Sequence, residues 1–107
     1  MAIPVILAPA ALQDIEDIKF YLEQRSETVA SRFADSINKT FDLLSRMPYL
    51  GELHPFKDPT MQNIRIWRVK GFPNHLIFYR VESERIVIVR LRHGATNYME
   101  EFESEGF

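Results

Sequence analysis

Two stretches of helical periodicity, joined by a very short link, constrain the fold of this chain more than any other feature. In the first, apolar residues recur at steps of three and four from Ala10 to about Gln24, and charged residues take the positions between them. The second begins after Ser26, a natural N-cap, and ends at about Arg46, before Pro48. Helices joined by so few residues pack as an antiparallel hairpin.

Strand-like segments flank the predicted hairpin on both sides. Before it, residues 3–7 form a short apolar run with Pro4 near its start, which is typical of an edge strand. After it, the prolines of residues 52–63 predict a loop. Three strands separated by turns then follow, at residues 64–69, 75–81 and 85–92. The last two are apolar on both faces, so we expect them at the centre of the sheet.

This order of elements, β-α-α-β-β-β, predicts an α+β fold in which the helical hairpin covers one face of an antiparallel sheet. The chain has 107 residues, of which 46% are hydrophobic, a size that suits one hydrophobic core. We therefore expect residues 1–107 to form a single domain. A last helical turn is expected at residues 98–102, with Phe102 packing inward.

Composition excludes several kinds of site. The chain has no cysteine, which excludes disulfides, thiolate nucleophiles and cysteine-based metal centres. Its three histidines, His54, His75 and His93, are scattered, so neither a metal nor a cofactor is expected. No apolar run approaches the roughly 20 residues that cross a bilayer. We expect no membrane contact and a cytoplasmic location.

Charge is distributed unevenly along the chain. The formal net charge is −2, yet residues 62–99 contain seven lysines and arginines against two glutamates. The segments on either side are acidic. Because partner choice follows the local field, this cationic stretch could bind nucleic acid or an acidic protein. The alternative is that it only forms solvated strand faces.

Several local strings occur in a characteristic order along the chain. They are Leu7-Ala8-Pro9-Ala10-Ala11 with Asp14-Ile15, Ile18 and Tyr21; Ala30 with Phe33; Leu44-Ser45-Arg46-Met47-Pro48 with Gly51; Phe78-Tyr79-Arg80-Val81; and Arg90 with His93-Gly94-Ala95. Together they resemble the RelE/ParE toxins of type II toxin–antitoxin systems, and the ParE-like branch fits better than the RelE-like one. The resemblance extends from Ile3 to about Phe102. It implies a toxin that a cognate antitoxin holds inactive, of the kind associated with plasmid stabilisation.

The resemblance leaves two targets open, because fold does not decide function. ParE-like members inhibit DNA gyrase, whereas RelE-like members cleave mRNA on the ribosome. A pI near 5.9 lacks the overall positive charge that favours RNA binding, so gyrase inhibition by binding is the leading hypothesis and a ribosome-dependent endoribonuclease is the alternative. A third hypothesis is an attenuated module that binds its antitoxin and little else, since Thr96-Asn97 stands where the ParE-like pattern usually has Arg-Asp.

Cations and aromatic groups of the strand region supply the candidates for target binding. They are Arg65, Trp67, Arg68, Arg80, Arg90 and His93. No catalytic residue is assigned to an inhibitor. A nuclease would use Arg65 and Arg80 for phosphate charge and His93 as acid or base, because the unperturbed pKa of histidine lies near neutrality. Each arginine has an alternative interpretation as a surface cation paired with a carboxylate. Glu52 could act as a catalytic carboxylate in the manner of some RelE-like enzymes, but a loop glutamate after Gly51 is more often solvated.

The antitoxin is expected to bind the helical hairpin and the adjoining sheet edge. A segment that orders on binding recovers its lost entropy by burying apolar anchors in a groove. The apolar side chains proposed to form that groove are Leu22, Phe33, Ile37 and Phe41.

Overall fold

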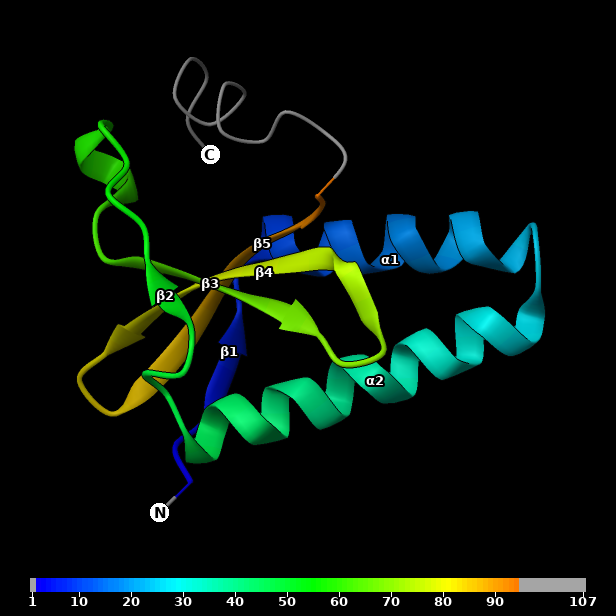
Figure 1. Ribbon diagram of the computed structural model, residues 1–107, viewed down its shortest axis with the longest axis horizontal. Coiled ribbons are helices and arrows are strands. Elements are labelled where there is room, and N and C mark those ends of the chain that lie inside the picture. Colours follow the sequence, from blue (N-terminus) through cyan, green and yellow to red (C-terminus); the bar gives the residue numbers. More distant parts are fainter. Residues whose placement is uncertain (1, 95–107) are drawn as a thin grey trace.

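The fold consists of a five-stranded sheet with a helical hairpin on one face (Figure 1). The structure is a computed structural model that describes residues 2–94. The elements in chain order are β1 (Val5–Leu7), α1 (Pro9–Glu23), α2 (Glu27–Arg46), β2 (Glu52–Leu53), the 3-10 helix η1 (Pro59–Met61), β3 (Ile64–Val69), β4 (Phe72–Glu82) and β5 (Arg85–His93). The strand order is β1-β5-β4-β3-β2, so β5 and β4 lie inside the sheet as predicted.

The predicted α+β fold with a helical hairpin is confirmed, with one correction to the sheet. Strand β1 pairs parallel to β5, with Val5 opposite Ile86 and Leu7 opposite Ile88, whereas the other neighbouring strands are antiparallel. The sheet is therefore mixed. The alternation of side chains along a strand is the same in both orientations, so the sequence pattern did not carry this information. The predicted loop at 52–63 also contains the short strand β2.

Both helices begin and end where local chemistry predicts. Pro9 occupies the first turn of α1. At α2, the hydroxyl of Ser26 accepts a hydrogen bond from the backbone N–H of Val29 at 3.2 Å, which confirms the predicted N-cap. The helix ends at Arg46, two residues before Pro48. Within residues 2–94, neither helix combines the length and apolar character needed to cross a membrane.

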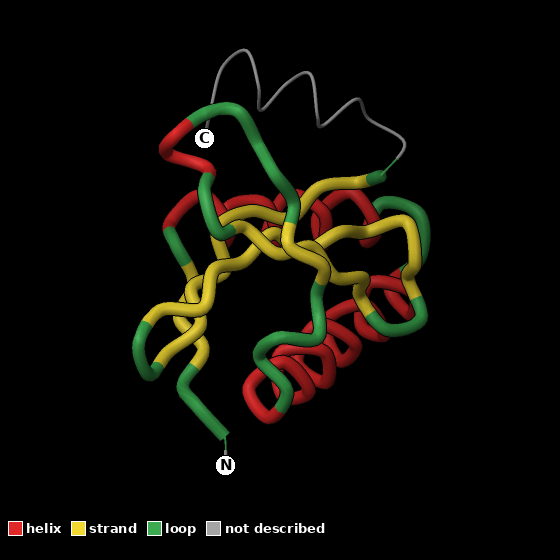
Figure 2. The backbone as a smooth tube through the Cα atoms, turned by 60° about the vertical axis from the view of Figure 1, so that its left-hand side comes forward, coloured by secondary structure: helices red, strands yellow, loops and turns green. Residues whose placement is uncertain are grey.

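The two faces of the sheet are covered differently, as Figure 2 shows with α2 on one side of the strands and the η1 loop on the other. On the helix-covered face, side chains from both helices pack on the sheet around Tyr79. On the opposite face, called here the open face, Phe56 and Met61 pack over Ile64 and Phe78. The predicted loop thus covers part of the open face and leaves the rest of it without a covering element among the described residues.

A buried tyrosine connects the end of α2 to the middle of the sheet. The hydroxyl of Tyr79 accepts a hydrogen bond from Gly51 N–H at 2.8 Å and donates one to the carbonyl oxygen of Pro48 at 2.8 Å. A side chain at Gly51 has no room, because a Cβ there would lie 2.7 Å from the Tyr79 hydroxyl and 2.9 Å from the carbonyl oxygen of Ile66. These contacts fix the turn that leads from α2 into β2.

We expect Tyr79→Phe to lower the free energy of unfolding by roughly 1 to 3 kcal/mol, because Gly51 N–H and the Pro48 carbonyl lose their partner. Urea unfolding followed by circular dichroism measures the change. Tyr49→Phe is the matched control, since the Tyr49 side chain is exposed. Equal stability of Tyr79→Phe and the unmodified protein would contradict this role.

Candidate functional site

Arg90, a predicted target-binding residue, is engaged inside the molecule by a carboxylate of α1. Its Nε and Nη2 atoms donate to the two carboxylate oxygens of Asp14 at 2.7 and 3.1 Å. Asp14 also accepts the backbone N–H of Leu91 at 2.9 Å and lies 3.7 Å from Arg92 Nη1. The side chains of Arg90 and Asp14 are only 15% and 9% exposed. Arg90 is thus a cation paired with a carboxylate, which was the alternative to target binding, and the pair holds α1 against β5.

Arg65 supports the turn between α2 and β2. Its Nη1 atom donates to the carbonyl oxygen of Gly51 at 2.8 Å, and its guanidinium lies 5.0 Å from the centre of the Tyr49 ring. In the sheet, Arg65 is directly opposite Tyr79, whose side chain belongs to the core under the helices. Directly opposite residues share a face of the sheet, so Arg65 lies on the helix-covered side.

Arg80 lies on the other face and holds the η1 loop. Its Nη2 atom donates to the carbonyl oxygen of Thr60 at 2.8 Å, and its Nε atom donates to that of Gln62 at 3.2 Å. It follows Tyr79 directly in β4, and successive side chains of a strand point to opposite faces. Arg65 and Arg80 are therefore separated by the sheet.

His93 lies at the far end of the same strands, beside His75. The two residues are paired across β4 and β5, with ring centres 5.0 Å apart. His75 also contacts the rings of Phe33 and Phe72, and its Nδ1 atom is buried without a hydrogen-bond partner. Burial and the neighbouring His93 lower the pKa of His75 below its ordinary value of 6.5. At about 3.3 Å per residue, the five steps along β4 from His75 to Arg80 span about 17 Å.

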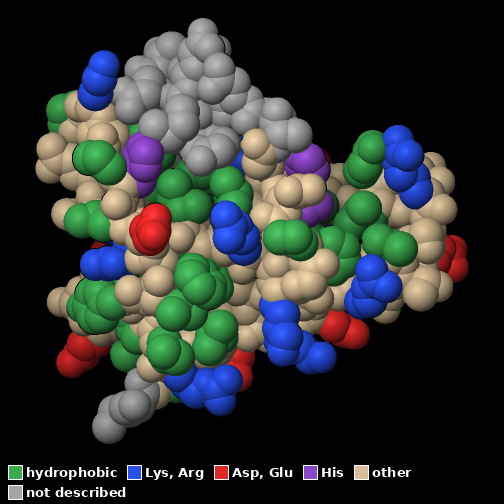
Figure 3. Space-filling view, viewed as in Figure 1, with side chains coloured by type: hydrophobic (Ala, Val, Ile, Leu, Met, Phe, Trp, Pro, Cys, Tyr) green, Lys and Arg blue, Asp and Glu red, His purple; other side chains and the backbone are tan. Residues whose placement is uncertain are grey.

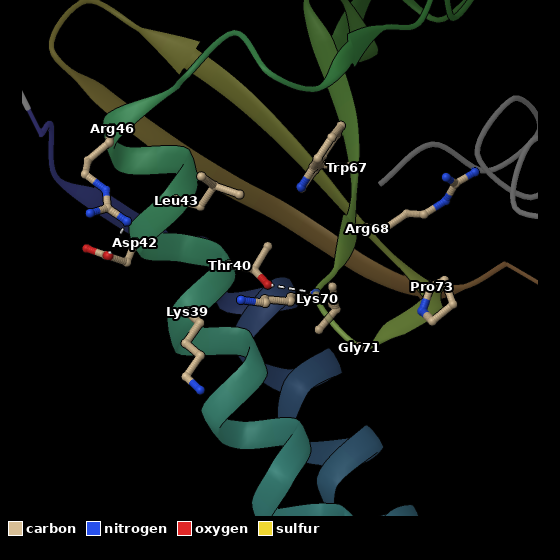
Figure 4. A pocket seen from close by; sticks show the side chains of 11 residues that line it. Lys39, Thr40, Asp42, Leu43, Arg46, Trp67, Arg68, Lys70, Gly71 and Pro73 are labelled. Atoms are coloured by element: carbon tan, nitrogen blue, oxygen red, sulfur yellow. Dashed lines mark hydrogen bonds and ion pairs between the residues drawn. The ribbon is translucent and has the colours of Figure 1, made fainter.

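Trp67 and Arg68, the remaining target-binding candidates, line a groove between β3 and α2 (Figure 4). The groove has a volume of about 490 Å³, and a hydrogen bond from the backbone N–H of Lys70 to the Thr40 hydroxyl at 3.0 Å joins two of its lining residues across β3 and α2. Its lining is strongly cationic and includes one carboxylate, Asp42, which lies 2.9 Å from Arg46. The cations of the lining are Lys39, Arg46, Arg68 and Lys70.

A second pocket, called here the open-face pocket, lies across β3 from this groove. It has a volume of about 390 Å³ and an apolar border formed by Leu53, Ile66 and Leu76. Its polar side chains are Glu52, His54 and Arg68, with Trp67 also in the lining. It therefore gathers a carboxylate, an imidazole and a guanidinium from β2, the loop after it and β3.

Sequence reasoning did not find this combination. It considered Glu52 as a catalytic carboxylate but favoured a solvated loop residue, and it gave no role to His54. The two residues reach β3 because β2 pairs Glu52 with Ile66 and His54 N–H bonds to the Ile64 carbonyl at 2.9 Å. A strand of two residues has too short a pattern to be recognised, so no sequence signal was strong enough to find it. No group of three His, Asp or Glu side chains within residues 2–94 could hold a metal ion.

The apolar residues proposed for antitoxin binding form part of the core. Phe33 and Ile37 are buried, and Leu22 and Phe41 are half-buried against the same cluster. The outer surface of the hairpin carries other apolar side chains, each more than half exposed; these are Leu12, Phe20 and Tyr21 of α1. Figure 3 shows the apolar and cationic side chains interspersed on one side of the molecule. Thr96, Asn97 and the predicted turn at 98–102 lie outside the described residues.

Comparisons with known proteins agree on one kind of relative. A family model described as the ParE toxin of the type II toxin–antitoxin system parDE matches residues 5–98. No curated protein matches the chain. Among solved structures, the chromosomal ParDE system from P. aeruginosa is similar at 17% identity with a TM-score of 0.66, covering 86% of this chain and 96% of the other.

Two further structures are similar in fold. The RelBE2 toxin–antitoxin complex from Mycobacterium tuberculosis matches at 18% identity with a TM-score of 0.59, covering 87% of this chain and 99% of the other. The YoeB/ParE toxin from Agrobacterium tumefaciens matches at 22% identity with a TM-score of 0.57, covering 84% and 96%. At these identities the likeness is one of fold.

We expect Asp14→Asn to destabilise the protein, and Asp14→Ala to cost roughly 3 to 5 kcal/mol, because the guanidinium of Arg90 loses its buried counter-charge. Thermal and urea unfolding measure both changes. Asp17→Asn is the control, since Asp17 is an exposed residue of the same helix. A loss of stability no larger than that of the control would show that the ion pair does not hold α1 to β5.

We also expect the stability of the protein to fall as pH falls through about 6.5. The pKa of His75 is lower in the folded chain, so the unfolded chain binds the proton more tightly. The stabilisation by neutral His75 is therefore present above pH 6.5 and lost on acidification. Replacing His75 by Phe keeps an aromatic ring and should flatten this part of the stability profile. An identical profile for His75→Phe and the unmodified protein would refute the assignment.

Proposed function

Because the chain belongs to the ParE toxin family of type II toxin–antitoxin systems, we propose that it inhibits DNA gyrase by binding and that a cognate antitoxin neutralises it. The fold and the family match support the assignment as a toxin. The choice between gyrase and the ribosome as its target depends on the functional site. The proposal places the protein in the cytoplasm, where its target and its antitoxin would be, and makes it a single-domain binding protein that needs no metal or cofactor.

The observation that carries the proposal is the separation of the three residues that a nuclease was expected to use. Arg65 and Arg80 lie on opposite faces of the sheet, and each donates to backbone carbonyl groups. His93 lies at the other end of β4, beside His75. A phosphodiester cannot contact all three, whereas general acid–base catalysis requires its groups within hydrogen-bonding reach of one substrate. Inhibition by binding makes no such demand.

The cations that remain for target binding lie along β3 and α2. Arg68 is exposed and lines both the groove and the open-face pocket, and Lys39 and Lys70 add charge to the groove. Within residues 2–94, none of these three forms an ion pair. A protein partner with an acidic surface would meet a cationic ridge there, with Trp67 as an aromatic contact.

For the antitoxin, the exposed apolar side chains of α1 are better placed than those chosen from the sequence. Leu12, Phe20 and Tyr21 are available on the outer surface of the hairpin, while Phe33 and Ile37 are already buried. A segment that folds on the toxin gains most by covering such side chains. The hairpin therefore stays the proposed antitoxin surface, with different residues.

The open-face pocket favours a second candidate function, a RelE-like endoribonuclease. Glu52 or His54 could take the proton of a 2′-hydroxyl, and Arg68 could stabilise charge on the phosphate. Arg65, Arg80 and His93, which a nuclease was expected to use, are not among the residues that line this pocket. It gives the nuclease alternative a definite set of residues to test.

We expect the purified protein to inhibit DNA supercoiling by gyrase, and its expression without antitoxin to induce the DNA-damage response while mRNA stays intact. Arg68→Ala should weaken inhibition, by roughly 2 to 5 kcal/mol in affinity if the contact is desolvated. Glu52→Gln and His54→Gln should remain toxic, because binding requires no proton transfer. Arg85→Ala is the matched control, since Arg85 begins β5 after the β4–β5 turn, is not in the lining of either pocket and pairs with Glu82 at 3.0 Å.

The opposite pattern would establish the nuclease. Loss of a general acid or base typically costs about 10² to 10⁴ in rate, so Glu52→Gln or His54→Gln would then abolish toxicity. Cleaved mRNA with unaffected supercoiling would accompany it. Circular dichroism of each variant excludes unfolding as the cause.

A further inference from the structure

The groove between β3 and α2 has an apolar part and a cationic part. Trp67 and Leu43 belong to the apolar part, and Figure 4 shows the indole of Trp67 directed from β3 toward Leu43 on the helix. The Trp67 side chain is half-buried, and its indole N–H has no hydrogen-bond partner among residues 2–94. An aromatic surface and an unused donor are therefore available to a ligand.

The cationic part contains Lys39 and Lys70. Lys70 directly follows β3, and Lys39 precedes Thr40 on α2. The hydrogen bond from Lys70 N–H to the Thr40 hydroxyl therefore brings the two lysines together, one from the sheet and one from the helix. Both lysines are exposed, and neither forms an ion pair within the described part of the chain. Two ammonium groups so placed favour a compact anion.

The other charged side chains of the lining add little to this cationic part. Arg46 lies 2.9 Å from Asp42, which pairs with it. Arg68 is directly opposite Leu76 of the open-face cluster, and Figure 4 shows its side chain directed away from α2. The chain as a whole has a net charge of −2, which disfavours binding of a polynucleotide. The groove thus suits a small ligand with one anionic group.

The walls of the groove are fixed by the fold. The buried Thr40 hydroxyl donates to the carbonyl oxygen of Ser36 at 2.7 Å while it accepts the N–H of Lys70. Val69, another lining residue, belongs to the core under the helices. The volume of about 490 Å³ is within the range of small-molecule sites, about 300 to 1,000 Å³. A small ligand can therefore bind without rearranging either wall.

We propose that this groove binds a mononucleotide, with the base against Trp67 and Leu43 and the phosphate between Lys39 and Lys70. A phosphate monoester concentrates about −1.5 to −2 charges and three acceptor oxygens at one point. Two adjacent ammonium groups match that better than the dispersed carboxylates of an acidic peptide. A base offers a π-face for the indole and acceptors for its N–H.

This binding goes beyond the inhibition of gyrase and does not depend on it. The two activities are nevertheless connected, because Lys39 and Lys70 are also among the cations proposed to meet the target. A bound nucleotide would neutralise them and compete with an acidic protein surface. The amount of free toxin would then respond to the concentration of the nucleotide.

Trp67 reports binding, because it is the only tryptophan of the chain. Titrating the full-length protein with adenosine monophosphate should quench its fluorescence, and equilibrium dialysis should give the same dissociation constant. Adenosine and orthophosphate should each bind at least about tenfold more weakly, because each keeps only one part of the contacts. Lys39→Ala and Lys70→Ala should each weaken binding about tenfold. Lys19→Ala is the matched control, since Lys19 lies on α1 and not in the groove lining.

Asp42→Asn gives a test that loss of folding cannot imitate. Asp42 is an exposed carboxylate of the groove lining, and its neutralisation removes repulsion of the phosphate and releases Arg46. Adenosine monophosphate should therefore bind several-fold more tightly to this variant. Asp35→Asn should leave binding unchanged, since Asp35 is an exposed residue of the same helix outside the groove lining.

Three results would overturn the proposal. One is the absence of quenching and of binding at about 1 mM adenosine monophosphate. Another is orthophosphate binding as tightly as the nucleotide, which would leave an anion site without recognition of a base. The third is tighter binding of a glutamate-rich peptide than of the nucleotide, which would assign the groove to a protein partner. These measurements use the isolated protein without gyrase, so their failure leaves the proposed target unaffected.

Discussion

Much of this structure depends on one carboxylate in the first helix. Asp14 accepts two hydrogen bonds from Arg90 and one from the backbone of Leu91, so a single side chain satisfies a buried cation and a backbone donor of β5. Removing either charge would leave the other buried without compensation. Through this contact α1 is held to the interior of the sheet, and the end of β5 is fixed beside β4. The position of His93 at the end of β5 follows from it.

A second set of contacts serves the other end of the sheet in the same manner. Tyr79, Arg65 and Arg80 all donate to backbone carbonyl groups, and together they fix the turn after α2 and the η1 loop. Three polar side chains of central strands are thus used to hold irregular segments. Of the cationic stretch seen in the sequence, these uses leave Arg68 and Lys70 exposed near β3. The cationic stretch does have an excess of positive charge, but several of its arginines stabilise the fold through internal hydrogen bonds.

The sequence predicted those features that depend on neighbours in the chain. Ser26 and Pro48 marked the ends of α2, and the apolar runs located β4 and β5, because caps, prolines and periodicity act over a few residues. Features that depend on distant partners were not predicted. The sequence around Asp14 did not indicate its ion pair, because its partner Arg90 is 76 positions away. Leu12 and Tyr21 fitted the apolar stripe of α1 but are exposed, because the sheet covers only part of the helix surface.

The parallel pairing of β1 with β5 has a consequence for synthesis. In the described sheet Val5 of β1 is opposite Ile86 of β5, so the partner strand of β1 is synthesised only after both helices and the strands between them. Contacts of such long sequence separation raise contact order and slow folding, because a large loop must close before they form. A growing chain therefore exposes an unpaired β1 until β5 has been synthesised. For a toxin, this delay separates synthesis from activity and gives an antitoxin time to meet the chain before it has folded.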